Sequence, residues 1–349
     1  MQTSFGTLEI SHRIKQDNAL MKAHALIQWE RLRPQLTGLY KRELSHGGGQ
    51  EPIDPLLMFK ALILGQWHSL SDAKLEEALQ MRVDFIIFCG LNLHEQAPDE
   101  TTLCRFRNRL INAGKLSGLL ASINQQLQAH GLMIKQAQGA IVDATLITAA
   151  ARPRSDITID EPSNDEASDI PATSDKQAVS ADPDATWVKK GKRAYFGYRT
   201  HIITDAEDGY VRGVHSTPAN ESEITQLQAT LATSDFTPQR LYADKGYASQ
   251  GNRDSLRQQK IKSAIMHKAQ RNKPLTRRQR LANKLIAKPR AIIERCFGTV
   301  KRLFDMQRTR YFGTHKVNAQ FTLKAICMNL LKAANKISLI HPPQQGRCA

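Results

Sequence analysis

One acidic residue, Asp143, stands in the middle of the apolar run Gly139-Ala-Ile-Val-Asp-Ala-Thr-Leu-Ile147. The β-branched and apolar residues of this run predict a buried strand, a setting that disfavours aspartate. A second run, Leu241-Tyr-Ala-Asp-Lys-Gly-Tyr247, has the same character and places Asp244 at the end of a short strand, before a glycine. An unpaired buried carboxylate is costly, so strand packing alone explains neither aspartate. The two runs therefore predict strands that carry acids to a site.

A third acid, Glu294, lies in a late basic stretch that we expect to be helical over residues 288–302. At about 100° per residue, Arg290 and Lys301 fall close to Glu294, so one carboxylate is predicted to lie between two cations. The adjoining face is apolar and is predicted to pack into a core: Ile293, Val300, Leu303 and Phe304. A lone acid among bases is typical of a solvated ion pair. This helix therefore indicates a functional site only in combination with the two aspartates.

Asp143, Asp244 and Glu294 together are the ligands of a predicted metal site, although each alone could be a satisfied buried acid. Carboxylate oxygens that leave positions for water and phosphate suit Mg²⁺ or Mn²⁺. Two such ions can activate the attacking oxygen and stabilise the leaving oxygen of a phosphodiester displacement. We therefore expect Mg²⁺ or Mn²⁺ at this site. The histidines lack the spacing of a zinc site, and no GxxxxGK[ST] segment indicates ATP-driven chemistry.

The charge of the chain is basic and unevenly distributed. The formal net charge is +16, yet residues 155–184 contain nine acids and one lysine. Sixteen Lys or Arg residues lie within residues 260–310. Such an excess favours polyanion binding, because Lys and Arg neutralise phosphates and release counterions. We expect nucleic acid as the partner, the alternative being a merely basic protein, and we expect the acidic segment 155–184 to be a flexible insert.

Other sequence features indicate the compartment. The five cysteines include no CxxC pair, which argues against a disulfide scaffold and a zinc ribbon and favours a reducing compartment. The first residues lack the pattern of a secretion signal, and no apolar run is long enough to span a bilayer. We therefore expect a cytoplasmic protein that makes no membrane contact.

Hydrophobic periodicity divides the chain into three parts. Residues 1–50 are predicted to be a helical extension, and residues 51–135 an all-helical, DNA-binding domain. Residues 136–340 are predicted to follow the order strand, strand, strand, helix, strand, helix, strand, helix, with the last helix over residues 319–337. This order favours an α/β domain, a mixed sheet flanked by helices that resembles the ribonuclease H fold.

Several polar and aromatic residues have two possible roles. Arg105 and Arg109 share one face of a predicted helix, which suits DNA docking or, equally, a solvated surface. Trp187 beside the basic run 189–193 could stack on bases, although core packing is the expectation, and the same holds for Tyr195. The two polar residues that precede or open the next helix are expected to cap it, with a place near the metal site as the alternative. They are Asn220 and Glu223.

From about residue 52 to 335 the chain resembles the DDE transposases of bacterial insertion sequences, and more closely insertion sequence family five. The resemblance is carried by Asp143-Ala-Thr, Tyr242-Ala-Asp-Lys-Gly-Tyr247 and Arg290-x3-Glu294-x6-Lys301. Residues 98–109, 189–201 and 217–222 are also similar to that family. One departure is Ala287, because the family signature often has tyrosine three residues before the arginine.

The resemblance implies a ribonuclease H-like catalytic domain in which Asp143, Asp244 and Glu294 bind two divalent ions. Such an enzyme binds the terminal inverted repeats of its element, cleaves there, and joins the freed 3′-OH to target DNA. Two ends must be brought together, which favours a homodimer. The residues expected to contact DNA or phosphate are Arg290, Lys301, Lys245, Arg105 and Arg109. Two alternatives remain: a DDE-type nuclease without strand transfer, and a non-catalytic DNA-binding relic or repressor.

Overall fold

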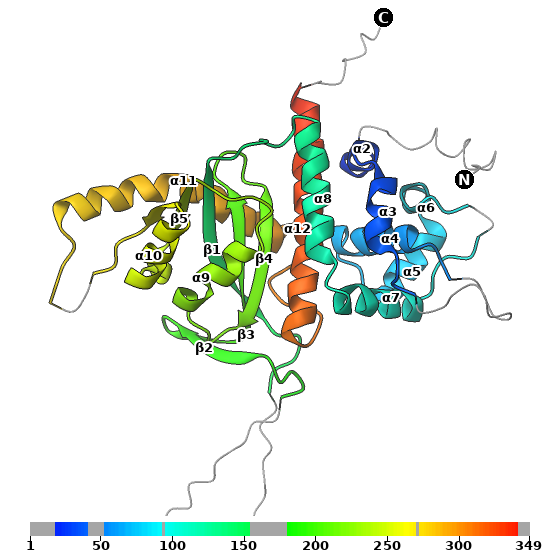
Figure 1. The fold of residues 1–349 in the computed structure, drawn as a ribbon. Helices are drawn as coiled ribbons and strands as arrows, with labels where there is room; N and C mark the ends of the chain where they lie inside the picture. The colour runs from blue at the N-terminus through cyan, green and yellow to red at the C-terminus, as the bar shows by residue number, and fades with distance from the viewer. Residues whose placement is uncertain (1–17, 41–51, 93–94, 154–179, 270–271, 341–349) are drawn as a thin grey trace, which may run out of the picture.

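A six-stranded mixed sheet forms one part of the computed structural model, which describes residues 18–40, 52–92, 95–153, 180–269 and 272–340 (Figure 1). The strands are β1 (Gly139–Thr148), β2 (Thr186–Lys190), β3 (Arg193–Asp205), β4 (Val211–Pro218), β5 (Arg240–Ala243) and β6 (Lys262–Ile265). Strand β1 runs antiparallel to β3 and parallel to β5, and β5 pairs in parallel with β6. Strands β2 and β4 both pair with β3, along its first and second parts.

Helices cover both faces of the sheet. They are α9 (Glu223–Ala232), α10 (Gln250–Gln258), α11 (Arg277–Arg302) and α12 (Thr314–Ile340). Val142 of β1 belongs to the same buried cluster as Leu227 of α9, whereas its neighbour Ile141 belongs to the cluster that contains Ile293 of α11. Because successive strand residues point to opposite faces, Asp143 lies on the α11 face. The apolar residues on both sides of β1 are those of a strand covered on both faces.

The N-terminal part of the described chain is helical. Its helices are α2 (Ala19–Leu26), η1 (Trp29–Leu32), α3 (Arg33–Leu36), α4 (Pro55–Trp67), α5 (Asp72–Met81), α6 (Val83–Cys89), α7 (Glu100–Asn112) and α8 (Leu116–Ala129). Asp54, Ser71 and Asp99 cap three of them through side-chain bonds to backbone N–H groups. These caps are the polar residues that the sequence places before each apolar run.

Helix α12 joins the helical part to the sheet, because it packs on α2, α4 and α8 and also on β4. Figure 1 shows it between the two parts. The fold-class prediction, a mixed α/β sheet with flanking helices preceded by a helical part, is therefore confirmed. One buried cluster runs from Leu20 to Ala333 across both parts. The division of the chain into domains at residues 50 and 135 stays a prediction.

Three expectations need correction. Helix α12 begins at Thr314 rather than Ala319, and Leu303 is 63% exposed rather than packed. The end of the acidic segment is ordered: buried Asp182 accepts hydrogen bonds from the Tyr198 hydroxyl and from the Gly313 backbone N–H. The composition of the acidic segment predicts flexibility, but it does not predict these hydrogen bonds of the Asp182 carboxylate. Residues 154–179 of that segment lie outside the described residues.

No helix in the described ranges combines the length and the apolar character needed to span a bilayer.

Candidate functional site

Two acids meet where strand β5 ends beside β1. The strands pair in parallel register, with Val142 opposite Ala243, so Asp143 and Asp244 follow side by side. Arg290 of α11 reaches both carboxylates: its Nη2 lies 2.7 Å from Asp143 Oδ2, and its Nη1 lies 3.5 Å from Asp244 Oδ1. The structure thus brings the two predicted aspartates together around one guanidinium.

The contact between Asp143 and Arg290 is largely removed from water, because their side chains are 15% and 11% exposed. Burial raises the pKa of Asp143, since it disfavours the charged form, while the Arg290 guanidinium and the Ala144 N–H oppose the rise. The Ala144 backbone N–H donates to Asp143 Oδ1 at 2.8 Å. Asp244 adds repulsion. Two carboxylates that share one guanidinium keep a formal negative charge, which a metal cation could offset.

Asp244 is held by its own turn. Its Oδ1 accepts the backbone N–H of Lys245 at 2.6 Å, at the start of the short helix η2 (Lys245–Tyr247). The Lys245 side chain is exposed and forms no salt bridge with the part of the chain that the structure describes. This lysine is therefore available beside the acids.

Glu294 lies outside the contact between Arg290 and the aspartates. Its side chain is exposed and makes no hydrogen bond or ion pair with any described residue. The predicted position of Glu294 between two cations is wrong, because Arg290 turns to the aspartates and Lys301 Nζ donates to the Leu146 carbonyl at 3.4 Å. Water screens the exposed carboxylate of Glu294 but not that of buried Asp143, so the guanidinium pairs with Asp143.

The predicted metal site is assembled only in part. Among the described residues, no group of three or more His, Cys, Asp or Glu side chains is arranged to hold a metal ion. Asp143 and Asp244 fit a hard cation by donor type, and they already share a cationic partner. Glu294 lies one helical turn beyond Arg290 with a free carboxylate. Two of the three predicted ligands therefore fit in this arrangement.

A further carboxylate, Glu223, lies in the first turn of α9 near the aspartates. Arg199 of β3 pairs with it, Nη1 to Oε1, at 3.6 Å. Its Oε2 is so close to Gly246 that a Cβ added there would lie 1.9 Å away. Burial raises the pKa of Glu223; Arg199 opposes this rise, and the charges of Asp143 and Asp244 add to it. Glycine at position 246 therefore allows a third acid to approach the turn that carries Asp244.

The expected capping roles are not observed. The residue before α9 is Ser222, which makes no side-chain cap bond, and Asn220 Oδ1 accepts a hydrogen bond from Thr186 Oγ1 at 3.0 Å. The alternative, Glu223 near the acidic site, agrees with the geometry. The sequence does not indicate the role of Arg199, because a basic residue in a strand has no local signal of its partner.

A buried polar pair supports the turn after Asp244. The Tyr247 hydroxyl and His201 Nδ1 lie 2.7 Å apart and link η2 to β3. Burial lowers the pKa of His201 to about 3, with smaller contributions from His215 and Arg199, so the ring is neutral at neutral pH. The pair thus holds the turn in place without adding charge to the site.

The arginines of α7 differ in their surroundings. Arg105 and Arg109 are exposed, and the Arg109 guanidinium lies over the Tyr40 ring at 5.3 Å. Arg107 is buried, pairs with Asp72 at 2.6 Å and lies over the Tyr311 ring. Arg107 is therefore structural, and the exposed pair is the one available to a partner.

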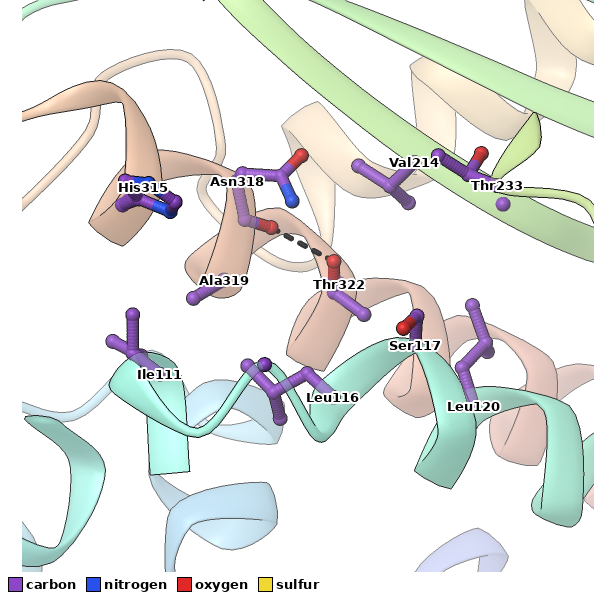
Figure 2. Close-up of a pocket in the computed structure, with 12 residues that line it drawn as sticks. Ile111, Leu116, Ser117, Leu120, Val214, Thr233, His315, Asn318, Ala319 and Thr322 are labelled. Atoms are coloured by element: carbon purple, nitrogen blue, oxygen red, sulfur yellow. Dashed lines mark hydrogen bonds between the residues drawn. The ribbon is translucent and has the colours of Figure 1, made fainter. Parts of the chain in front are cut away.

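A cavity of about 180 Å³ lies elsewhere, between α8, β4 and α12. Figure 2 shows Leu116, Val214 and Asn318 around it. None of the predicted site residues lines this cavity, so it is separate from the acidic site.

Both the helical part and the sheet part of the chain are similar to known proteins. Residues 134–330 match the family model described as Transposase DDE domain, and residues 8–109 match the model described as Transposase domain (DUF772). The chain is similar to the transposase for insertion sequence element IS1106 of Neisseria meningitidis serogroup B. The two are 43% identical over 237 residues, which is 67% of this chain and 78% of that protein. No solved structure matches the chain.

Proposed function

Because this chain belongs to the DDE transposase family, we propose that it cleaves DNA at the terminal inverted repeats of an insertion sequence and joins the freed 3′-OH to target DNA. The observation that carries this proposal is the meeting of Asp143 and Asp244 around Arg290. Two acids from adjoining strands, paired with a late helix, form an anionic centre on an otherwise basic chain. Such a centre suits metal-assisted chemistry on a phosphodiester.

Asp143 and Asp244 are the proposed ligands of divalent cations, and Glu294 is the proposed third acid. Bound Mg²⁺ or Mn²⁺, in a pair, would activate the attacking oxygen and stabilise the leaving oxygen. The hard oxygen donors of the aspartates and the free carboxylate of Glu294 support this assignment. Asp244 is fixed by the Lys245 N–H, so its carboxylate needs little further ordering.

The cationic side chains have a separate proposed role. Arg290, Lys301 and Lys245 would hold phosphate oxygens at the acidic site, and Arg290 also balances the aspartates. The exposed Arg105 and Arg109 would contact the DNA backbone from the helical part. Because two element ends must be joined, a homodimer on DNA is part of the proposal. The reaction would take place in the cytoplasm, where the element's DNA lies.

A nicking assay tests the proposed cleavage. Wild-type protein and Asp143→Asn are incubated with Mg²⁺ and duplex DNA that carries the element's own inverted repeat. Asp254→Asn, an acid that is 44% exposed on α10, is the matched control. We expect nicking at the repeat end by the wild type and the control, and none by Asp143→Asn. Equal nicking by all three would contradict the site, and binding without nicking would favour a DNA-binding relic.

A further inference from the structure

The hairpin of β2 and β3, residues 186–196, projects beyond the sheet. Strand β1 makes its last pair with β3 between Thr148 and Gly197, whereas β2 pairs with β3 from Gly197 back to Arg193. The pairs nearer the turn therefore have no β1 neighbour. Gly191, with φ of +61°, closes the turn. Figure 1 shows the hairpin extending past the lower end of the sheet.

The hairpin is basic and has no acid of its own. Lys189, Lys190, Lys192 and Arg193 are all exposed, and no Asp or Glu occurs in residues 185–204. Across the described ranges, none of these four side chains forms a salt bridge. Like charges this close repel one another, so the cluster is suited to a polyanion rather than to an internal partner.

The basic face of the hairpin leads to Arg199 and its partner Glu223, beside the acidic site. Arg193 and Arg199 lie on the same face of β3, because every second strand residue does, and Lys190 pairs with Arg193. Burial is the main cause of the shifted pKa values of Glu223 and Lys301, and the charge of Lys190 lowers both. From Arg193 to Arg199 the strand spans roughly 20 Å, which is about six base-pair steps of duplex DNA.

The opposite face of the hairpin presents an aromatic ring. Trp187 is 52% exposed, so the expected core packing is wrong. Its ring lies 5.3 Å from that of Phe196, which is 5% exposed and fixed in a small core. Lys189 shares the Trp187 face. The hairpin therefore carries basic side chains on both faces and a supported indole on one.

We propose that the β2–β3 hairpin enters a groove of the DNA beside the acidic site. A two-stranded ribbon fits the major groove of B-DNA. Lys190 and Arg193 would neutralise phosphates on one side, and Lys189 on the other, while Trp187 packs against the groove. The hairpin would thereby hold the duplex that leads to Asp143 and Asp244. This inference rests on the proposed function only in taking DNA as the ligand.

Salt-dependent binding tests the charged part of the inference. The full chain with Asp244→Asn is used, so that the inverted-repeat duplex stays intact, and its dissociation constant is measured from low to high salt. Adding Lys189→Gln and Lys190→Gln should weaken binding and reduce the salt slope by about 1.8, since each lost phosphate contact removes about 0.9. The control adds Lys135→Gln and Lys260→Gln, two exposed lysines outside the hairpin. Equal changes in both pairs would overturn the inference.

Fluorescence tests the aromatic part. Of the three tryptophans, Trp29 is buried and Trp67 is half-buried, so acrylamide quenching reports chiefly on Trp187. Duplex DNA should protect the Asp244→Asn protein from acrylamide, and this protection should vanish when Trp187→Phe is added. Unchanged quenching on DNA binding would overturn the inference while leaving the cleavage proposal intact. If the Asp244→Asn protein bound no DNA at all, both this inference and the proposed function would be contradicted.

Discussion

Arg290 Nη2 lies 2.7 Å from Asp143 Oδ2, so a helix residue 147 positions later in the chain provides the cation for a carboxylate in strand β1. Both side chains are nearly buried. The same guanidinium reaches Asp244 at 3.5 Å. This contact ties α11 to the two strands that carry the acids.

Replacing Arg290 should destabilise the protein. Arg290→Gln leaves Asp143 without its cation, and breaking a buried pair in this way costs about 3 kcal/mol. Arg290→Lys should reduce the free energy of unfolding by a smaller but measurable amount. The lysine ammonium cannot contact two carboxylates at once as the planar guanidinium does. Urea unfolding of metal-free protein measures both. The control is Arg257→Gln, which removes an arginine that is 80% exposed in its pair with Asp254. If Arg257→Gln lost as much stability as Arg290→Gln, this expectation would be contradicted.

Asp143→Asn should change how the stability of the protein depends on pH. The folded-state pKa of Asp143 is raised, chiefly by burial, so the folded protein holds this proton more tightly than the unfolded chain does. Wild-type stability therefore falls as pH rises from below about 4 through the folded-state pKa. Asp143→Asn lacks this loss, so its melting temperature relative to that of the wild type should increase from pH 3 to pH 7.

Asp54→Asn is a control variant for Asp143→Asn, because its effect on stability should change with pH in the opposite direction. Although burial raises the pKa of Asp54, hydrogen bonds from Arg33 and the Leu56 N–H bring it below the usual value. The Asp54 carboxylate therefore stabilises the fold above its unfolded pKa, and Asp54→Asn should be most harmful at pH 7 and less so at pH 3. Melting curves across this range that moved in the same direction for both variants would contradict the two assignments.

Glu294→Gln should reduce DNA cleavage while leaving the stability of the protein almost unchanged. The side chain is exposed and forms no bond with the described residues, so the free energy of unfolding should change by less than about 0.5 kcal/mol. Cleavage should fall on the order of 100-fold or more if Glu294 is the third acid. Glu77→Gln, an exposed glutamate on α5, serves as the matched control in single-turnover cleavage at saturating DNA. Full activity of Glu294→Gln would remove Glu294 from the site and favour Glu223 in its place.

Lys324 should make stability depend on alkaline pH. It is 1% exposed, it donates to the Phe304 carbonyl, and burial lowers its pKa to about 8. Between this value and the unfolded pKa of about 10.4, the unfolded chain binds more protons, so wild-type stability should rise with pH. Relative to Lys324→Met, the wild-type melting temperature should increase from pH 8 to pH 10. A constant difference would contradict the lowered pKa. Burial raises the folded-state pKa of neighbouring Cys327 to about 12. The titration of this thiol in the unfolded chain is common to both proteins, so it cancels in the comparison with Lys324→Met.

Sequence reasoning succeeds where local pattern and sheet geometry agree. Asp143 and Asp244 stand at matching positions of two apolar strands, and parallel pairing brings such residues to one edge. The capped helices and the α9 core positions, such as Leu227, follow from periodicity for the same reason.

The sequence pattern does not predict which tertiary partner a side chain contacts. A helical wheel places Arg290 beside Glu294, but it cannot rank that exposed neighbour against a buried carboxylate on a distant strand. Trp187 is a large aromatic residue of the kind that usually packs in a core, yet it is 52% exposed on the β2–β3 hairpin. Asp182 lies in an acidic segment, and its partners are the Tyr198 hydroxyl of β3 and the backbone N–H of Gly313, just before α12. Each difference arises from a tertiary contact that no local window contains.

Strand transfer tests the central claim most directly. Wild-type protein and Asp244→Asn are given Mg²⁺, a pre-cut end with the element's inverted repeat, and a target plasmid. The account predicts joined products for the wild type and none for Asp244→Asn, with DNA binding retained by both. Joined products from Asp244→Asn at the wild-type rate would contradict the acidic site, and cleavage without joining by the wild type would identify a nuclease rather than a transposase.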